Sequence, residues 1–171
     1  MKLFLFIIIL CFCGFTQDPD KCIIIPLKGI NDIVIDKSSF EDVKKEFGKK
    51  KIKKKWSRTE LEIFGHFDYS IKYDQIGTFS SISIPGRSKH VVNFVEIDST
   101  CKCKTKKGLG IGSSYQDVIK ELGKPKYFWF MNGNTELNYE ENKLNMAIML
   151  NGRDTTTNKV YEICWYASHR H

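Results

Sequence analysis

A stretch of twelve residues occurs twice in this chain, 75 positions apart. Residues 38–49 align without a gap on residues 113–124, and eight of the twelve positions are identical. A match of this length at one fixed offset is typical of a structural unit that is used twice. The sequence therefore predicts an internal duplication, in which each copy contains the same short segment.

The duplicated segment has the pattern of a short amphipathic helix. Ser38 with Glu41, and Ser113 with Gln116, have the spacing of a capping box in the first turn. Apolar residues recur three and four positions apart and give each segment one apolar stripe, and a glycine ends it. Helices this short are not stable alone in water. We therefore expect each helix to rest on another element.

Short β-rich runs follow each predicted helix and are separated by glycine, proline or asparagine. They are residues 61–64, 69–73, 79–84 and 91–97 after the first helix, and residues 135–139, 144–150 and 160–166 after the second. Runs of strands after a helix, instead of strict alternation, favour an α+β fold with antiparallel sheets. The predicted fold is α+β with two tandem repeats, each a short helix packed on a three- or four-stranded antiparallel meander. The repeat modules are predicted at residues 22–100 and 104–171.

The first residues have the pattern of a secretory signal peptide, predicted at residues 1–16. Met1-Lys2 precedes an apolar run from Leu3 to Cys13, and small residues follow at Gly14 and Thr16. The run is shorter than the roughly 20 residues that a spanning helix needs. No later stretch is apolar enough, so we expect no transmembrane helix in the mature chain. The predicted location is outside the cytoplasm, either periplasmic or secreted.

Two alternatives to simple export remain open for this N-terminal segment. Cys11 and Cys13 lie where a lipidated cysteine would sit, although bulky Leu10 and Phe12 precede them. A lipid-anchored form is therefore one alternative. The other is a buried N-terminal strand.

Export changes how the remaining cysteines are interpreted, because disulfides persist in oxidising compartments. The mature chain keeps four candidates for disulfide bonds, Cys22, Cys101, Cys103 and Cys164. Four cysteines allow three pairings. Links from the two central cysteines to the two outer ones would tie both ends of the chain to its middle, whereas a direct Cys101–Cys103 bond would be strained. A C-x-C pair without a second cysteine pair or nearby histidines is a weak zinc signal, so we predict disulfides and no metal site.

The second copy carries a pattern that resembles a known family. The pattern comprises Gly110–Pro125, Leu137-x-Tyr139, Leu144–Leu150 and Val160-x-x-Ile163. It is similar to the small exported modules related to the SmpA/BamE outer-membrane assembly lipoproteins, and the tandem arrangement resembles the duplicated β-lactamase-inhibitor proteins. The likeness covers residues 104–166 and, more loosely, residues 30–98. It implies an exported binding module, and the chain departs from both families in its run of lysines.

Catalytic patterns are missing from the sequence. It has no G-x-S-x-G, H-E-x-x-H or phosphate-binding glycine loop. Gly108-Leu-Gly110-Ile-Gly112 precedes a helix, but the other copy has Ile-Val-Ile-Asp-Lys at that place, so we interpret it as a flexible turn. We predict a protein that is not an enzyme and binds no cofactor.

The two copies differ most just after their helices, and there the sequence predicts the binding residues. One copy has a basic run that supplies seven positive charges, equal to the net charge of +7 of the whole chain; the other has four consecutive aromatic residues. The predicted binding residues are Lys49, Lys50, Lys51, Lys53, Lys54, Lys55, Trp56, Tyr127, Phe128, Trp129 and Phe130. Exposed aromatics are enriched at protein interfaces, but burial of the four aromatics between the repeats is equally open. The lysines can equally form a solvated loop that binds nothing.

These observations favour an exported, non-catalytic binding or inhibitor-like module. Its expected partner is a protein or an anionic surface of the cell envelope, because an exported basic protein meets phosphorylated lipids, anionic glycans or acidic proteins. We expect no nucleic-acid partner. The alternative is a structural accessory of envelope assembly, with or without a lipid anchor, and an enzyme of unknown type is the third possibility.

Overall fold

The computed structural model describes residues 22–57, 66–82, 91–154 and 156–167, and these residues form a mostly β protein. The strands are β1 Ile24–Ile25, β2 Gly29–Ile30, β3 Ile33–Val34, β4 Lys53–Ser57, β5 His66–Tyr73, β6 Gly77–Ile82, β7 Phe94–Ile97, β8 Tyr127–Met131, β9 Asn134–Glu141, β10 Leu144–Leu150 and β11 Val160–Ala167. The helices are α1 Phe40–Phe47 and α2 Tyr115–Leu122. The predicted signal peptide at residues 1–16, Cys11, Cys13 and the predicted strand at residues 61–64 lie outside the described residues.

Eight of these strands form one antiparallel sheet in the order β4-β5-β6-β7-β11-β10-β9-β8. The prediction of an α+β fold built from two helix-on-meander repeats is therefore wrong. Each helix has only eight residues, and β7 pairs with β11 from Ile97 opposite Ile163 to Phe94 opposite Tyr166. This pairing merges the strands that follow both helices into a single sheet. The pairing joins residues far apart in the chain, so no local sequence pattern predicts it.

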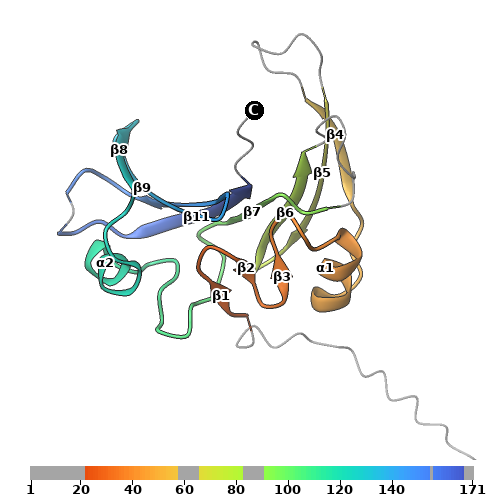
Figure 1. Ribbon diagram of the computed structural model, residues 1–171, viewed down its shortest axis with the longest axis horizontal. Helices are drawn as coiled ribbons and strands as arrows, with labels where there is room; N and C mark the ends of the chain where they lie inside the picture. The colour runs from red at the N-terminus through yellow and green to blue at the C-terminus, as the bar shows by residue number, and fades with distance from the viewer. Residues whose placement is uncertain (1–21, 58–65, 83–90, 155, 168–171) are drawn as a thin grey trace, which may run out of the picture.

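The remaining elements cover one side of this sheet. Figure 1 shows α1, α2 and the small sheet of β1, β2 and β3 on the same side, while β4 and β8 rise at opposite ends of the large sheet. The core fills the space between these layers. From the helices and the small sheet it takes Phe40, Val43, Phe47, Val118, Ile30 and Ile33, and from the large sheet Ile71, Phe79, Val95, Leu137, Ile148, Ile163 and Trp165.

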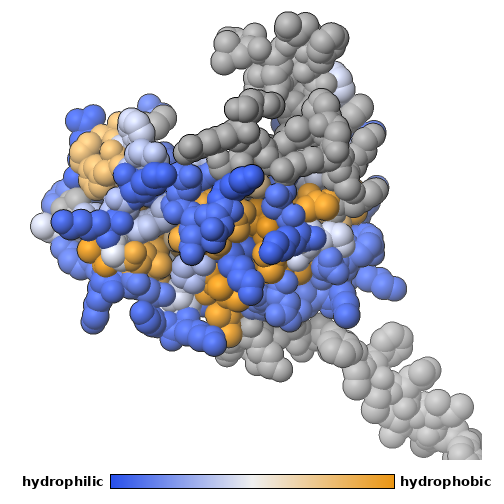
Figure 2. All heavy atoms as spheres, in the orientation of Figure 1, coloured by the Kyte–Doolittle hydropathy of each residue, from blue (hydrophilic) through white to orange (hydrophobic). Residues whose placement is uncertain are grey.

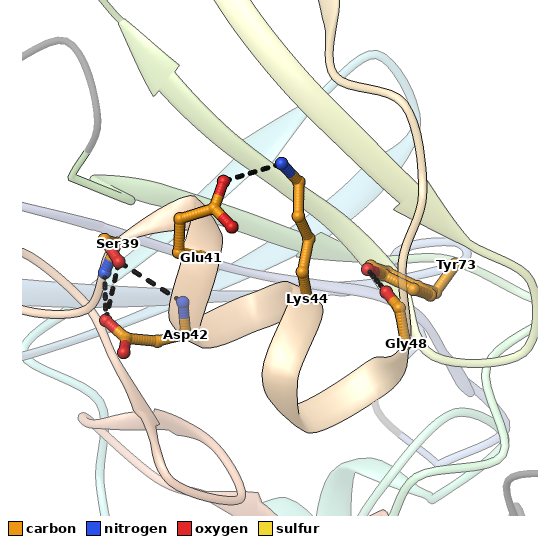
Figure 3. Close-up of polar contacts among 6 residues, drawn as sticks. All are labelled: Ser39, Glu41, Asp42, Lys44, Gly48 and Tyr73. Carbon is orange, nitrogen blue, oxygen red and sulfur yellow. Dashed lines mark hydrogen bonds and ion pairs between the residues drawn. The ribbon is translucent and has the colours of Figure 1, made fainter. Parts of the chain in front are cut away.

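Both predicted helices are present, and their capping boxes lie one residue later than predicted. Ser39 caps α1 and exchanges hydrogen bonds with Asp42 (Figure 3). Ser114 caps α2 with Asp117 in the same way. The first serine of each pair has another role, since the Ser38 hydroxyl accepts from the Val34 backbone N–H at 2.9 Å. These bonds hold the pKa of the two capping carboxyl groups below the ordinary value.

A tyrosine of the large sheet closes the end of each helix. The Tyr73 hydroxyl of β5 donates to the backbone carbonyl of Gly48, after α1 (Figure 3), and the Tyr139 hydroxyl of β9 donates to that of Gly123, after α2, at 3.0 Å. The last carbonyls of a helix have no partner within it. Each tyrosine therefore fixes a helix end against the sheet, and burial raises the pKa of both hydroxyls.

Residues 24–34 form a small antiparallel sheet whose turns need special backbone conformations. Gly29 has a φ of +148°, and a Cβ at this position would lie 2.0 Å from the carbonyl oxygen of Ile33. Only glycine fits there. Gly29 begins β2, so its conformation lets β2 pair closely with β3 and places Ile30 and Ile33 in the core.

One disulfide bond joins Cys22 to Cys103, with the two Cα atoms 4.8 Å apart. Cys22, one of the two outer cysteines, thus pairs with Cys103, one of the two central ones, as the sequence predicted. The other two do not pair with one another, because Cys101 lies beside Cys103 in the connector while Cys164 lies in β11 opposite Glu96. Both are buried free thiols, and burial raises their pKa, to about 11 for Cys101 and about 12 for Cys164.

In the part of the chain that the structure describes, neither helix is long or apolar enough to cross a membrane.

Candidate functional site

The predicted basic residues form a surface at one edge of the large sheet. We define the lysine surface as Lys44, Lys45, Lys49, Lys50, Lys51, Lys53, Lys54 and Lys55. They come from the last turn of α1, the segment after it, and the edge strand β4. Sequence reasoning missed the first two, since they belong to the helix; only the fold brings them beside the others. All except Lys44 are exposed.

Some charges of the lysine surface are compensated. Lys44 forms an ion pair with Glu41 at 2.7 Å, and Lys50 lies 3.7 Å from Asp74. The ammonium group of Lys54 lies 5.8 Å from the centre of the Tyr69 ring, within the range of a cation–π contact. No ion pair joins Lys45, Lys49, Lys51, Lys53 or Lys55 to a carboxylate of the described residues. The surface therefore keeps an excess of positive charge.

A hollow lies within the lysine surface, beside the end of α1. Its volume is about 510 Å³, within the range of small-ligand sites. Its lining consists of Glu41, Lys44, Lys45, Lys49, Lys50 and Lys51. Five of these six side chains are cationic, so the hollow suits an anionic group. Three of the predicted lysines, Lys49, Lys50 and Lys51, thus line this hollow together with the two lysines from α1, whereas Lys53, Lys54 and Lys55 do not.

The predicted aromatic residues form β8, the opposite edge of the sheet. Tyr127, Phe128, Trp129 and Phe130 are each between 39% and 53% exposed. Figure 2 shows apolar atoms at the surface where β8 lies. The rings contact one another in alternation along the strand: the ring centres of Tyr127 and Trp129 lie 6.3 Å apart in a tilted pair, and those of Phe128 and Phe130 lie 4.9 Å apart, edge to face. One ring contact reaches a helix, between Phe128 and Tyr115 of α2, with the ring centres 6.5 Å apart.

The lysine surface and the aromatic strand are two separate surfaces. Six strands lie between β4 and β8 in the sheet, which corresponds to a distance of about 30 Å along a sheet with about 4.8 Å between strands. Trp56 belongs to the lysine edge, at the end of β4, and is 56% exposed. The structure therefore does not bring the two predicted segments together.

Carboxylates gather on the face of the large sheet that the helices leave uncovered. Glu136 of β9 and Glu162 of β11 both lie opposite Met149 in the strand register, and Glu96 of β7 lies opposite Cys164. Hydrogen bonds lower the pKa of Asp98 to about 2. They come from Thr100 and then from Lys72, whose ammonium group lies 3.0 Å from the carboxylate. Sequence reasoning missed this group, because alternation shows that such residues share a face only once the strand order is known. No set of three or more potential ligands in the described residues could hold a metal ion.

Glu162 is the least favourably placed carboxylate of this group. Burial, followed by the charges of Glu96, Asp98 and Glu136, raises its pKa above the ordinary 4.5. The charged form therefore destabilises the fold above that folded-state pKa. We expect Glu162→Gln to raise the melting temperature at pH 7. The corresponding gain in the free energy of unfolding should be less than about 1 kcal/mol. The gain should shrink as the pH falls through the folded pKa and vanish below the ordinary value.

Thermal unfolding followed by circular dichroism at a series of pH values measures this gain. The exposed Glu141→Gln variant is the matched control and should leave the melting temperature unchanged. A melting temperature of the Glu162 variant equal to or below that of the parent at pH 7 would contradict the expectation.

A second hollow of about 730 Å³ lies between the glycine-rich connector and α2. Its charged lining is mixed, with Lys104, Lys107 and Lys120 facing Asp117 and Glu121. The Asp117 carboxylate already occupies the amino-terminal end of α2 by accepting from the Ser114 N–H. The hollow consequently has no clear charge preference.

Comparisons with known proteins give this chain no family. No family pattern and no curated protein matches its sequence. Among solved structures, a DUF4309 family protein, YjgB from Bacillus subtilis subsp. subtilis str. 168, is similar at 12% identity and a TM-score of 0.45, over 81% of this chain and 84% of that one. A likeness this distant supports no statement about function. The resemblance to assembly lipoproteins and inhibitor proteins stays a prediction.

Proposed function

We propose that this chain is an exported, non-catalytic binding protein that docks on an anionic surface of the cell envelope through the lysine surface. The observation that carries the proposal is the hollow beside α1, lined by five lysines and a single glutamate. A phosphate or carboxylate group in this hollow would meet several ammonium groups at once. The cations of β4 continue the same surface along the sheet edge.

Electrostatics favours a dense anionic surface over a single small anion. Each lysine close to an anionic membrane contributes about 1 kcal/mol of attraction. This attraction decays over about 8 Å at physiological ionic strength, so only lysines that reach the surface together add up. Lys45, Lys49 and Lys51 line one hollow, and no described carboxylate forms an ion pair with them.

Trp56 supports a membrane surface as the docking partner. It is exposed at the end of β4, next to Lys55. Tryptophan is enriched at the boundary between lipid headgroups and acyl chains, because its ring is apolar and its N–H is polar. Lysines flanked by an exposed tryptophan are the combination that peripheral membrane proteins use. The predicted signal peptide would bring the chain to such a surface.

Vesicle binding tests the proposal with two charge-matched variants. The first replaces Lys45, Lys49 and Lys51 by glutamine, and the control replaces the exposed connector residues Lys102, Lys106 and Lys107. Both variants lose three positive charges. We expect the first to bind phosphatidylcholine vesicles containing phosphatidylglycerol at least about tenfold more weakly, since each of the three lysines contributes about 1 kcal/mol. The control should change affinity less than about threefold.

The measurement is co-sedimentation of the purified chain, as processed by its expression host, with vesicles at low and high salt. High salt should release the parent protein. Equal losses for both variants would mean that net charge alone drives binding, and equal binding to pure phosphatidylcholine would mean that anionic headgroups are not recognised. Either result would overturn the proposal.

A further inference from the structure

The two edges of the large sheet differ in how they are protected against pairing with another strand. An edge strand exposes unpaired backbone N–H and C=O groups, and natural proteins usually protect it with lysines, proline or a bulge. β4 has three consecutive lysines, Lys53, Lys54 and Lys55. β8 has no charged residue and no proline, and its pairing with β9 is regular from Tyr127 to Met131.

β8 has one strand neighbour among the described residues, β9. In an antiparallel pair, alternate residues direct their backbone groups away from the neighbour. Every second residue of β8 therefore presents a donor and an acceptor at the outer edge of the sheet. The aromatic rings stand above and below this edge, with Tyr127 and Trp129 on one face and Phe128 and Phe130 on the other.

The sequence of β8 is complementary to itself. If two copies of β8 pair antiparallel with Trp129 opposite Trp129, then Phe128 lies opposite Phe130, and Tyr127 opposite Met131. The Trp129–Trp129 and Phe128–Phe130 pairs are aromatic, and cross-strand aromatic pairs stabilise sheets. No like charges face one another in this register, because Lys126 would lie opposite Asn132, and its charge already meets Glu140 at 2.6 Å.

The net charge of the chain does not oppose this pairing. The lysine surface lies at the other edge of the sheet, beyond six intervening strands. At about 4.8 Å per strand this separation is about 30 Å, several times the screening length of about 8 Å. Two copies joined at β8 therefore keep their lysine surfaces far apart at the two outer ends.

We propose that β8 pairs antiparallel with β8 of a second copy of this chain, about a twofold axis at Trp129, so that one sheet runs through both molecules. A twofold contact uses the same patch on both partners, and β8 meets this requirement residue by residue. The dimer presents two lysine surfaces, one at each end. This inference does not depend on the proposed function, since it concerns the opposite edge of the sheet.

Sedimentation of the purified chain and two matched variants tests the dimer. Trp129→Lys places like charges opposite one another at the centre of the contact, and Trp56→Lys makes the same change at the other edge. The two tryptophans are similarly exposed, at 53% and 56%, so neither substitution disturbs the core. We expect the parent and Trp56→Lys to be dimers, and Trp129→Lys to be a monomer with an unchanged circular dichroism spectrum and a dimer dissociation constant raised at least about tenfold.

Cysteine cross-linking tests the register. Directly opposite Cα atoms in an antiparallel pair lie about 4.5–5.5 Å apart, within reach of a disulfide bond. Trp129→Cys should therefore form a covalent dimer on mild oxidation, whereas Phe128→Cys, opposite Phe130, should form far less. A monomeric parent protein at high concentration would overturn the proposal. So would a dimer that survives Trp129→Lys, or a monomer whose β8 binds only an extended segment of another protein.

Discussion

Replacing Phe79 by alanine should lower the free energy of unfolding by about 4 kcal/mol. Phe79 of β6 is fully buried, with its ring 5.3 Å from that of Phe47 in α1 and 6.2 Å from that of Tyr73 in β5. Removing this ring takes away its burial and leaves a cavity between α1 and the sheet. The neighbouring rings are those of Phe47 and Tyr73. The Phe47 ring belongs to the helix, and the Tyr73 hydroxyl donates to the Gly48 carbonyl after the helix, so both rings are fixed in place. They cannot collapse far into the space, and this is why we expect a value within the upper part of the range for such substitutions.

Urea unfolding followed by tryptophan fluorescence measures this loss. Trp56→Ala is the control, because this side chain is 56% exposed on β4 and its loss should change the free energy of unfolding by less than about 1 kcal/mol. A loss below about 1.5 kcal/mol for the Phe79 variant would show that α1 is not packed on β6 through this ring. The slope of the free energy of unfolding against urea concentration should stay unchanged if both variants fold to the same compact state.

The helices could be predicted from the sequence because their signals are local. Ser39 and Asp42 lie three residues apart, as do Ser114 and Asp117, and the apolar stripe of each helix repeats within eight residues. The error of one residue in the caps has a physical reason. Each copy has two adjacent serines, and only the three-dimensional structure shows that Ser38 bonds back to Val34.

The fold class could not be predicted from the same signals. The pairing of β7 with β11 joins Phe94 to Tyr166, 72 positions apart, and any strand with the right alternation could have occupied that place. Likewise, the lysine run does not have the composition of a strand, yet Lys53, Lys54 and Lys55 form one. Lysines are tolerated in β4 because it is an edge, where they also oppose unwanted pairing.

The residues of the candidate site could be predicted from the sequence, but their arrangement in space could not. The sequence shows that residues 49–56 are basic and residues 127–130 aromatic, but strand order alone places them at opposite edges. The same holds for the carboxylates of the uncovered sheet face. Glu96, Glu136 and Glu162 are far apart in the chain, and only the register of four strands brings them to one face.

Removing the Cys22–Cys103 disulfide bond should lower the free energy of unfolding by about 4 kcal/mol. The bond joins residues 81 positions apart, so in the unfolded chain it closes a long loop and removes many conformations. In the folded chain it holds the small sheet to the connector, where Ile24 also donates its backbone N–H to the carbonyl of Lys104 at 2.9 Å. Without the covalent bond, this short sheet of two-residue strands depends on its core residues and on a few backbone hydrogen bonds.

The variant for this test replaces Cys22 and Cys103 together by alanine. A single change at Cys103 would be ambiguous, because Cys101 is a free thiol only two residues away and could then pair with Cys22 in place of Cys103. Reductant should destabilise the parent protein by as much as the double substitution does, and should leave the double variant unaffected. Cys164→Ala is the control, since this buried thiol is free and has no part in the bond. Reductant-insensitive unfolding of the parent, or a mapped bond between another pair of cysteines, would show that the small sheet is held by packing and not by this link.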